Sequence, residues 1–205
     1  MANASASNPN PNYVIVSFSG KNIETTVTDE ASVVDAWISN IRSMYHGQQL
    51  IVGLDSEWRP NYRKYQNNKT AILQLCIETR CLIIQLFYLE HIPRSLRSFL
   101  GDPNVTFVGV EVASDAAKLR NEYGLVCSRT ADVRELAMNS WPSNFSRNPG
   151  LKDLASTVVG LSMPKQKRVT MSNWQSRVLN PLQIEYACID AYASYRIGHR
   201  LLKET

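Results

Sequence analysis

Hydrophobic and polar residues alternate in short runs in the first part of the chain, which is the pattern of β-strands. Residues 13–19 and 22–28 are two such runs around Ser19-Gly20-Lys21, so we expect a β-hairpin there. The continuous apolar run 50–54 is typical of a buried central strand. Further strands are expected at 71–77, 81–87, 105–110 and 126–128.

Apolar residues recur at helical spacing in other segments. The first of these follows Thr28, has Asp29 and Glu30 in its expected first turn, and ends near Gly47. The last begins at Asn180-Pro181, a capping residue before a first-turn proline, and runs to about Lys203. Further helices are expected at 92–100, 113–123, 130–138 and 151–159. Strands followed by helix-rich sequence predict an α/β fold with a mixed β-sheet flanked by helices.

The length and composition of the chain fit one folded domain. It has 205 residues, of which 44% are apolar and 20% are charged, so it can bury a substantial core. We expect residues 13–205 to form that domain and residues 1–12 to be a disordered tail, because this segment lacks the apolar core and basic charge of a targeting peptide. No apolar run reaches the length of a membrane helix, so no membrane partner is expected.

Charge and cysteine content narrow the expected environment. A net charge of +4 permits a nucleic-acid partner without demanding one. The four cysteines form no C-x-x-C pair and are expected to be reduced and mostly buried. The three histidines lack the spacing of a structural zinc site. These features predict an intracellular protein of the cytoplasm, the nucleus or both.

Two acids stand at the end of the expected central strand. Asp55 and Glu57 follow the apolar run directly, and strand alternation places them on one face, about 7 Å apart. Like charges this close are tolerated where a cation lies between them or where they reach water. A buried strand that delivers paired acids to its end is typical of sites in open α/β sheets. A solvated turn is the alternative.

Two further acids lie on expected helices. Asp115 follows a strand at a helix start, where an ordinary first-turn acid capped by Ser114 is the competing interpretation. Asp190 lies in the apolar run 187–191, where a carboxylate is costly to bury unless it is paired or bound to a metal. Tyr186 is one turn earlier on the same helix face, so a simple Tyr–Asp hydrogen bond is the alternative there.

The order of these motifs carries more information than any one of them. LDSEW at 54–58, an acid at a strand–helix junction and YACIDAY at 186–192 together resemble the DEDD superfamily of 3′→5′ exonucleases. The tyrosine four residues before the last acid is the mark of the tyrosine subgroup, whereas the histidine subgroup would carry histidine at the position of Glu185. The chain is similar to a stand-alone Werner-syndrome-type exonuclease domain, with ribonuclease D more distant, and the likeness spans residues 14–202.

The resemblance implies a ribonuclease-H-like fold and a nucleic-acid substrate degraded from its 3′ end, with two divalent ions, Mg²⁺ or Mn²⁺, as cofactors. It makes four acids the metal ligands, namely Asp55, Glu57, Asp115 and Asp190. Paired ions of this kind activate a water and stabilise the leaving oxygen of a phosphodiester. The resemblance also places Tyr186 beside the attacking water. Because an ordinary tyrosine has a pKa of about 10, we assign this residue to orienting the water, with proton acceptance secondary.

The second motif departs from the pattern of the family. Residues 110–115 are VEVASD, where relatives commonly carry glycine at one or more positions. Bulkier side chains are expected to narrow the substrate path there, and Glu111 adds a negative charge near it. The departure bears on efficiency and substrate range, whereas the complete set of acids with Tyr186 predicts an active hydrolase.

Basic and aromatic side chains directly after the first motif are candidates for holding substrate. Basic groups bind phosphates and aromatic rings stack on unpaired bases, although a solvated polar loop is the alternative. A second basic patch lies near the Ser-Asn-Trp sequence at 172–174, where a charged surface turn is the competing interpretation. The residues selected are Trp58, Arg59, Arg63, Lys64, Lys167 and Trp174.

The leading hypothesis is a metal-dependent 3′→5′ exonuclease acting on single-stranded or recessed 3′ ends. The competing hypothesis is a catalytically weak or inactive nucleic-acid-binding or scaffold module with the same fold, which would gain nothing from four carboxylates facing a polyanion. No motif marks groups that read a 2′-hydroxyl, so the choice between DNA and RNA stays open. A homo-oligomer is possible through the edges of the N-terminal hairpin.

Overall fold

A computed structural model describes residues 13–61, 65, 67–145, 148–164 and 167–204. The expected tail, residues 1–12, lies outside the described residues. The strands are β1 (Tyr13–Phe18), β2 (Lys21–Thr28), β3 (Leu50–Trp58), β4 (Thr70–Ile77), β5 (Arg80–Ile84), β6 (Val105–Gly109) and β7 (Thr130–Asp132). The helices are α1 (Ala31–Met44), α2 (Arg94–Leu100), α3 (Val112–Tyr123), α4 (Val133–Ser140), α5 (Leu151–Val159), α6 (Lys167–Thr170) and α7 (Pro181–Lys203), with a 3₁₀ turn at Pro142–Asn144.

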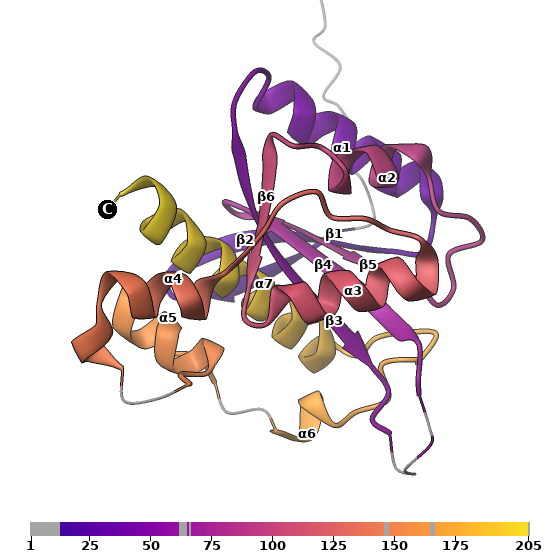
Figure 1. Ribbon diagram of the computed structural model, residues 1–205. Helices are drawn as coiled ribbons and strands as arrows, with labels where there is room; N and C mark the ends of the chain where they lie inside the picture. The colour runs from indigo at the N-terminus through magenta and orange to yellow at the C-terminus, as the bar shows by residue number, and fades with distance from the viewer. Residues whose placement is uncertain (1–12, 62–64, 66, 146–147, 165–166, 205) are drawn as a thin grey trace, which may run out of the picture.

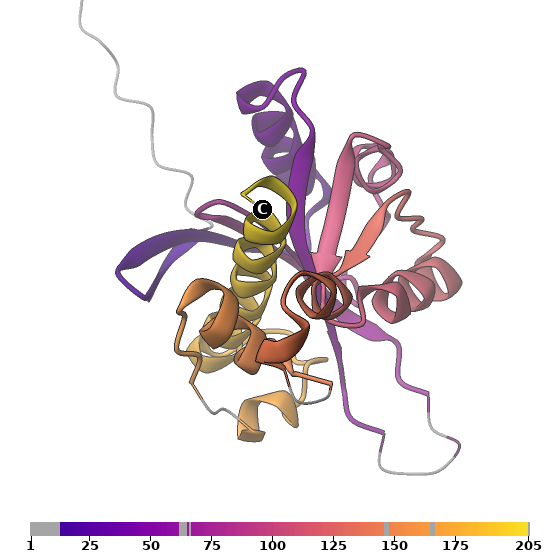
Figure 2. The same cartoon turned by 60° about the vertical axis from the view of Figure 1, so that its left-hand side comes forward.

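The described strands form one mixed sheet in the order β1-β2-β5-β4-β3-β6-β7. The pairs β1–β2, β3–β4 and β4–β5 are antiparallel, whereas β2–β5, β3–β6 and β6–β7 are parallel. Helix α7 crosses one face of the sheet with α4 and α5 packed against it, and α1, α2 and α3 lie on the other side (Figures 1 and 2). The expected fold class and N-terminal hairpin are therefore confirmed.

Two glycines let α7 lie unusually close to the sheet. A Cβ added to Gly53 of β3 would stand 2.0 Å from the Ala191 carbonyl oxygen and 2.7 Å from the Tyr195 amide nitrogen. A Cβ on Gly198 of α7 would stand 2.6 Å from the Val108 side chain. An isolated glycine inside a strand marks such a close backbone approach. The result is a long helix, largely buried over its second half, held directly against the central strand.

Several observed elements differ from those expected. Helix α1 begins at Ala31, so Asp29 and Glu30 precede it rather than occupy its first turn. Strand β7 occupies 130–132, where we expected the start of a helix, and residues 126–128 do not form a strand. Helix α6 occupies part of the segment expected to be a basic turn. A strand of three residues exists only through pairing with β6, which no local pattern reveals.

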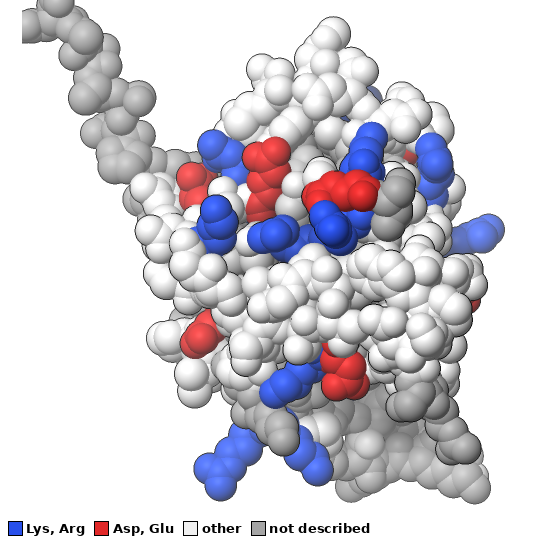
Figure 3. Space-filling model, turned by 90° about the vertical axis from the view of Figure 1, so that its left-hand side faces the viewer, with Lys and Arg blue, Asp and Glu red and all other residues white. Residues whose placement is uncertain are grey.

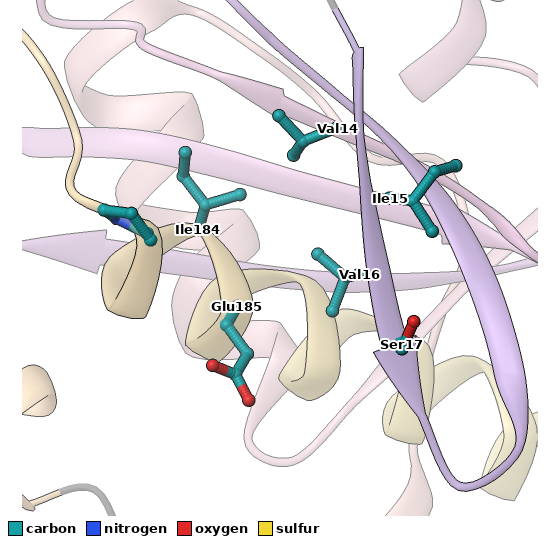
Figure 4. Close-up of a pocket in the computed structure, with 7 residues that line it drawn as sticks. Val14, Ile15, Val16, Ser17, Ile184 and Glu185 are labelled. Atoms are coloured by element: carbon teal, nitrogen blue, oxygen red, sulfur yellow. The ribbon is translucent and has the colours of Figure 1, made fainter.

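The N-terminal hairpin forms an open edge of the sheet. Strand β1 is at the end of the strand order, and Val14 and Ile15 are 45% and 53% exposed. A surface groove of about 410 Å³ runs between β1 and the start of α7, with Val16, Ile184 and Glu185 in its lining (Figure 4). None of the four candidate acids lines it, so this groove is not the candidate catalytic site.

The cysteines are free thiols, three of them buried and Cys127 half-buried, as expected from their apolar surroundings. Within the described ranges, every helix is too short or too polar to cross a lipid bilayer. The core is continuous from the hairpin to α7, and β4 is buried along its whole length.

Candidate active site

The fold brings the four candidate acids to one region from three separate elements. β3 and β6 run parallel, and α3 starts three residues after β6, so the end of β3 and the first turn of α3 lie at the same sheet edge. Helix α7 crosses that edge from the other face. The acids are Asp55 and Glu57 on β3, Asp115 on α3 and Asp190 on α7.

Ser56 joins two of these elements and was not selected from the sequence. Its hydroxyl donates to Asp115 Oδ1 at 2.6 Å, and its backbone N–H donates to Asp55 Oδ1 at 2.9 Å. Ser56 is buried, which shields the bond to Asp115 from water. Ser56 lies between two acids of one strand, so strand alternation points its side chain to the opposite face of the sheet. The sequence contains no other signal for the contact with Asp115.

Burial raises the pKa values of all four carboxyl groups, and neighbouring carboxylates raise those of Asp55 and Glu57 further. Burial and the charges of Glu57, Asp115 and Asp190 hold the pKa of Asp55 well above its usual range. Burial is the largest cause that raises the pKa of Glu57 to about 8, followed by the charges of Asp190 and Asp115. Burial raises the pKa of Asp190 to about 7, opposed by a hydrogen bond from Tyr186. Several buried like charges in one place are costly unless protons or cations neutralise them.

The donor set fits a hard divalent cation. Carboxylate oxygens are the ligands that Mg²⁺ and Mn²⁺ prefer, and a dication among these acids would offset the repulsion that raises the pKa values of Asp55 and Glu57. Among the described side chains, no three His, Cys, Asp or Glu groups converge closely enough to form a ligand set as they stand. The fit therefore rests on ligand chemistry and charge.

Tyr186 is held beside Asp190 by contacts on both sides. Its hydroxyl donates to the Asp190 carboxylate and receives a hydrogen bond from the Thr170 side chain. Burial and the charge of Asp190 raise the pKa of this phenol well above its ordinary value, so Tyr186 stays protonated at neutral pH. The indole of Trp174 lies 5.9 Å from the Tyr186 ring, centroid to centroid, and its N–H donates to the Thr170 carbonyl at 3.2 Å.

The structure contradicts direct substrate contact by Trp174. This side chain is only 1% exposed, so a nucleic-acid base cannot stack on it. The sequence placed it near a basic patch, but its large apolar ring is buried in the core between α6 and α7. Its contact with Tyr186 makes it a support for the phenol.

The remaining candidates for substrate binding that the structure describes belong to elements at one end of the molecule. Arg59 and Lys167 are exposed, Trp58 is half-buried, and α6 projects from the same end as the loop between β3 and β4 (Figures 1 and 2). Arg63 and Lys64 lie outside the described residues.

The side of the molecule drawn in Figure 3 has a broken charge pattern. In Figure 3, Lys and Arg form an upper and a lower group separated by mostly uncharged surface, with acidic side chains in both groups. The described residues of that face offer no continuous basic track for a phosphate backbone.

Glu111, in the unusual second motif, stands just before α3 in a strained conformation. Its φ of 55° is left-handed, which glycine adopts without strain. Its carboxylate pairs with Arg134 at 2.9 Å, and its N–H donates to Asp132 at 2.7 Å. Arg134 thus offsets part of the expected negative charge, although Glu111 still helps raise the pKa of Asp115 to about 6, after the larger effect of burial. Ser114 lies inside the helix rather than capping it.

Comparison with known proteins agrees with the geometry of the site. The sequence profile of the 3′–5′ exonuclease family matches residues 24–205. This chain belongs to the 3′–5′ exonuclease family. It is 33% identical over 155 residues to a 3′–5′ exonuclease of Arabidopsis thaliana, covering 75% of this chain and 52% of that protein. It is 27% identical over 167 residues to the bifunctional 3′–5′ exonuclease/ATP-dependent helicase WRN of Mus musculus, covering 81% of this chain and 12% of that protein.

A solved structure of the same family has the same fold. The crystal structure of the EXD2 exonuclease domain soaked in Mn and dGMP aligns with a TM-score of 0.52 and 28% identity, covering 87% of this chain and 88% of that one. The ribonuclease-H-like fold that the family resemblance implied is therefore confirmed. The chain spans about half the length of the plant relative and a small part of the helicase-linked one.

Proposed function

We propose that this chain is a metal-dependent exonuclease that hydrolyses phosphodiester bonds from the 3′ end of DNA or RNA. The observation that carries the proposal is the gathering of four acids from β3, α3 and α7 at one sheet edge, where neighbouring carboxylates raise the pKa values of Asp55 and Glu57. Membership of the 3′–5′ exonuclease family supports it, as does the relative whose crystals were soaked in Mn and dGMP.

The four acids are the proposed ligands of two divalent ions, Mg²⁺ or Mn²⁺. When bound, such ions make a water nucleophilic near neutral pH and stabilise the charge on the leaving oxygen. The protein holds the donors in place beforehand, because Ser56 ties Asp115 to β3 and Gly53 lets α7 bring Asp190 against the same strand. The unfavourable repulsion among the acids is the source of their affinity for cations.

Tyr186 is the proposed residue that orients the attacking water, as in the tyrosine subgroup of the family. Its raised pKa keeps the phenol protonated, so it acts through its hydrogen bonds and is a poor proton acceptor. Asp190 accepts from this hydroxyl, Thr170 donates to it, and Trp174 packs on the ring. These contacts leave the hydroxyl little freedom to turn.

The proposed substrates are single-stranded or recessed 3′ ends. Arg59, two residues after Glu57, and Lys167, on α6, are exposed and would bind phosphates. Arg63 and Lys64, which follow Arg59 in the sequence, are proposed to do the same. Self-association through the exposed edge of β1 stays a prediction, based on the tendency of open strand edges to pair. The intracellular location and the division into tail and single domain also stay predictions.

The test is incubation with a 5′-labelled oligonucleotide and Mg²⁺ or Mn²⁺. The expected result is a ladder that shortens stepwise from the 3′ end and is lost with EDTA or in Asp55→Asn. Parallel DNA and RNA substrates show which is preferred. Binding of both oligonucleotides without any ladder would instead support the non-catalytic scaffold module.

A further inference from the structure

The loop between β3 and β4 is closed at its base by its own polar contacts. We call its base, residues 59–61 and 67–69, the neck. The Asn68 side-chain amide donates to the carbonyls of Arg59 and Pro60 at 2.8 and 3.1 Å, and its backbone N–H donates to Asn61 Oδ1 at 3.0 Å. The neck continues directly from the strand end that carries Asp55 and Glu57.

Helix α3 contacts this neck through Lys118, one turn after Asp115. Lys118 Nζ donates to the Asn68 carbonyl at 2.9 Å, pairs with Glu122 and lies 5.0 Å from the centre of the Trp58 ring. The second oxygen of Glu122 accepts from the Thr70 N–H at 2.7 Å, on the other side of the neck. The two charged side chains are only 18% and 13% exposed.

A second residue of α3 strengthens the same attachment. The Tyr123 hydroxyl donates to the Thr70 carbonyl at 2.6 Å, and Lys69 Nζ lies 4.5 Å above the Tyr123 ring. Loops are usually solvated and held by few such contacts. Here α3 contains Asp115 in its first turn, and Lys118 and Tyr123 of the same helix contact the neck and the adjoining Thr70. The position of the neck relative to Asp115 is therefore set by one helix.

We propose that Lys118 is a positioning residue that fixes the neck, and with it Trp58 and Arg59, relative to the acid cluster. An incoming strand is then held so that its 3′ end reaches the acids. Lys118 already contacts a carbonyl, a carboxylate and an aromatic ring, so it acts through the neck rather than as a phosphate ligand. The inference rests on the proposed exonuclease function.

The test compares Lys118→Ala and Lys118→Arg with Arg120→Ala, which removes the same charge from an exposed position on the same helix. One measurement is the dissociation constant for a single-stranded oligonucleotide with Ca²⁺ in place of Mg²⁺. The other is kcat and KM on that oligonucleotide and on the p-nitrophenyl ester of thymidine 5′-monophosphate, which has one phosphodiester and no further strand for the neck to hold.

Lys118→Ala is expected to weaken oligonucleotide binding about tenfold, equivalent to about 1.4 kcal/mol. It should raise KM more than it lowers kcat, with a loss on the oligonucleotide about tenfold larger than on the ester. Lys118→Arg should recover most of the binding, since it keeps the charge and donors, and Arg120→Ala should stay within about twofold of wild type.

Equal losses on both substrates, no loss on either, or an equal effect of Arg120→Ala would overturn the proposal. If Lys118→Ala does not fold, Glu122→Gln removes the ion pair while keeping an acceptor for the Thr70 amide, and it should show the same bias toward the oligonucleotide. A wild-type protein that gives no ladder would refute the exonuclease function. The binding comparison would still decide the role of Lys118.

Discussion

The acid cluster and the neck of the β3–β4 loop share one strand yet are held in opposite ways. In the cluster, backbone packing brings α7 onto Gly53 and forces carboxylates together against their repulsion. In the neck, every charge that α3 contributes has a partner: Lys118 contacts Glu122 and Asn68, and Glu122 also accepts from Thr70.

This difference distinguishes residues that bind cations from residues that hold a loop in position. Groups that must bind cations are most useful when the protein itself leaves their charge uncompensated, so perturbed pKa values gather where function lies. Groups that only hold a loop in place are most useful when every donor and acceptor is satisfied, because partly satisfied polar networks are costly.

Replacing an acid of the cluster should have the largest effect. Asp190→Asn removes a proposed metal ligand and the acceptor for Tyr186, so exonuclease activity should fall at least about 10³-fold, or about 4 kcal/mol of transition-state stabilisation. The measurement is kcat/KM on a 5′-labelled oligonucleotide at saturating Mn²⁺. Glu135→Gln, an exposed acid of α4, is the matched control. Activity close to wild type in Asp190→Asn would remove this residue from the mechanism.

Gly53→Ala tests whether backbone packing builds the cluster. The added methyl would stand 2.0 Å from the Ala191 carbonyl, so α7 must move away from β3. We expect a loss of about 3 kcal/mol of folding free energy, which lowers Tm by about 6–12 °C in a domain of this size, together with loss of activity. Gly150→Ala is the control, since its Cβ would lie 3.8 Å from the nearest atom beyond its chain neighbours, Asp153 Oδ2. An unchanged Tm would show that α7 is not held so closely.

Tyr186→Phe removes one hydroxyl and keeps the ring against Trp174. Turnover should slow about 10²-fold, the low end of what a positioned group contributes to proton transfer and orientation. The Mn²⁺ concentration for half-maximal activity should stay the same, because the four acids are intact. An unchanged kcat would exclude Tyr186 from catalysis, whereas a shifted Mn²⁺ requirement would indicate that its main role is to hold Asp190.

Glu57→Gln tests the repulsion within the cluster without catalysis. Because the folded-state pKa of Glu57 is raised to about 8, the folded protein binds its proton more tightly than the unfolded chain does. The contribution of this group to stability therefore falls as pH rises from about 4.5 toward 8. In EDTA at pH 8 the variant should be more stable than wild type, on the order of 2 kcal/mol, and the two should converge near pH 4. Urea unfolding at both pH values measures this, and equal stability at pH 8 would contradict the raised pKa.

The smallest effect is expected on the neck. Tyr123→Phe removes the hydroxyl that donates to the Thr70 carbonyl while keeping the ring under Lys69. One lost hydrogen bond is worth about 1 kcal/mol of folding free energy, and the pH dependence of stability should not change. Urea unfolding at two pH values checks both statements. A loss that varied with pH would mean that the neck and the acid cluster are electrically coupled.

The sequence was most informative where side-chain type alone carries the message. Asp55, Glu57, Asp115 and Asp190 stand out because acids beside apolar runs are costly without a cation, and Tyr186 stands out by its spacing from the last of them. It was least informative about contacts between distant segments. Hydrophobic periodicity shows which face of an element is buried, but not which partner buries it.

Sequence alone thus determined the order of most strands and helices, the fold class and the set of chemical groups. Tertiary structure decided the rest. Pairing with β6 made residues 130–132 a strand, burial turned Trp174 from a candidate for stacking into a support for Tyr186, and α3 fastened the neck through Lys118. The physical reason is the same in each case: these roles depend on desolvation and on partners far away along the chain, and neither is encoded in local pattern.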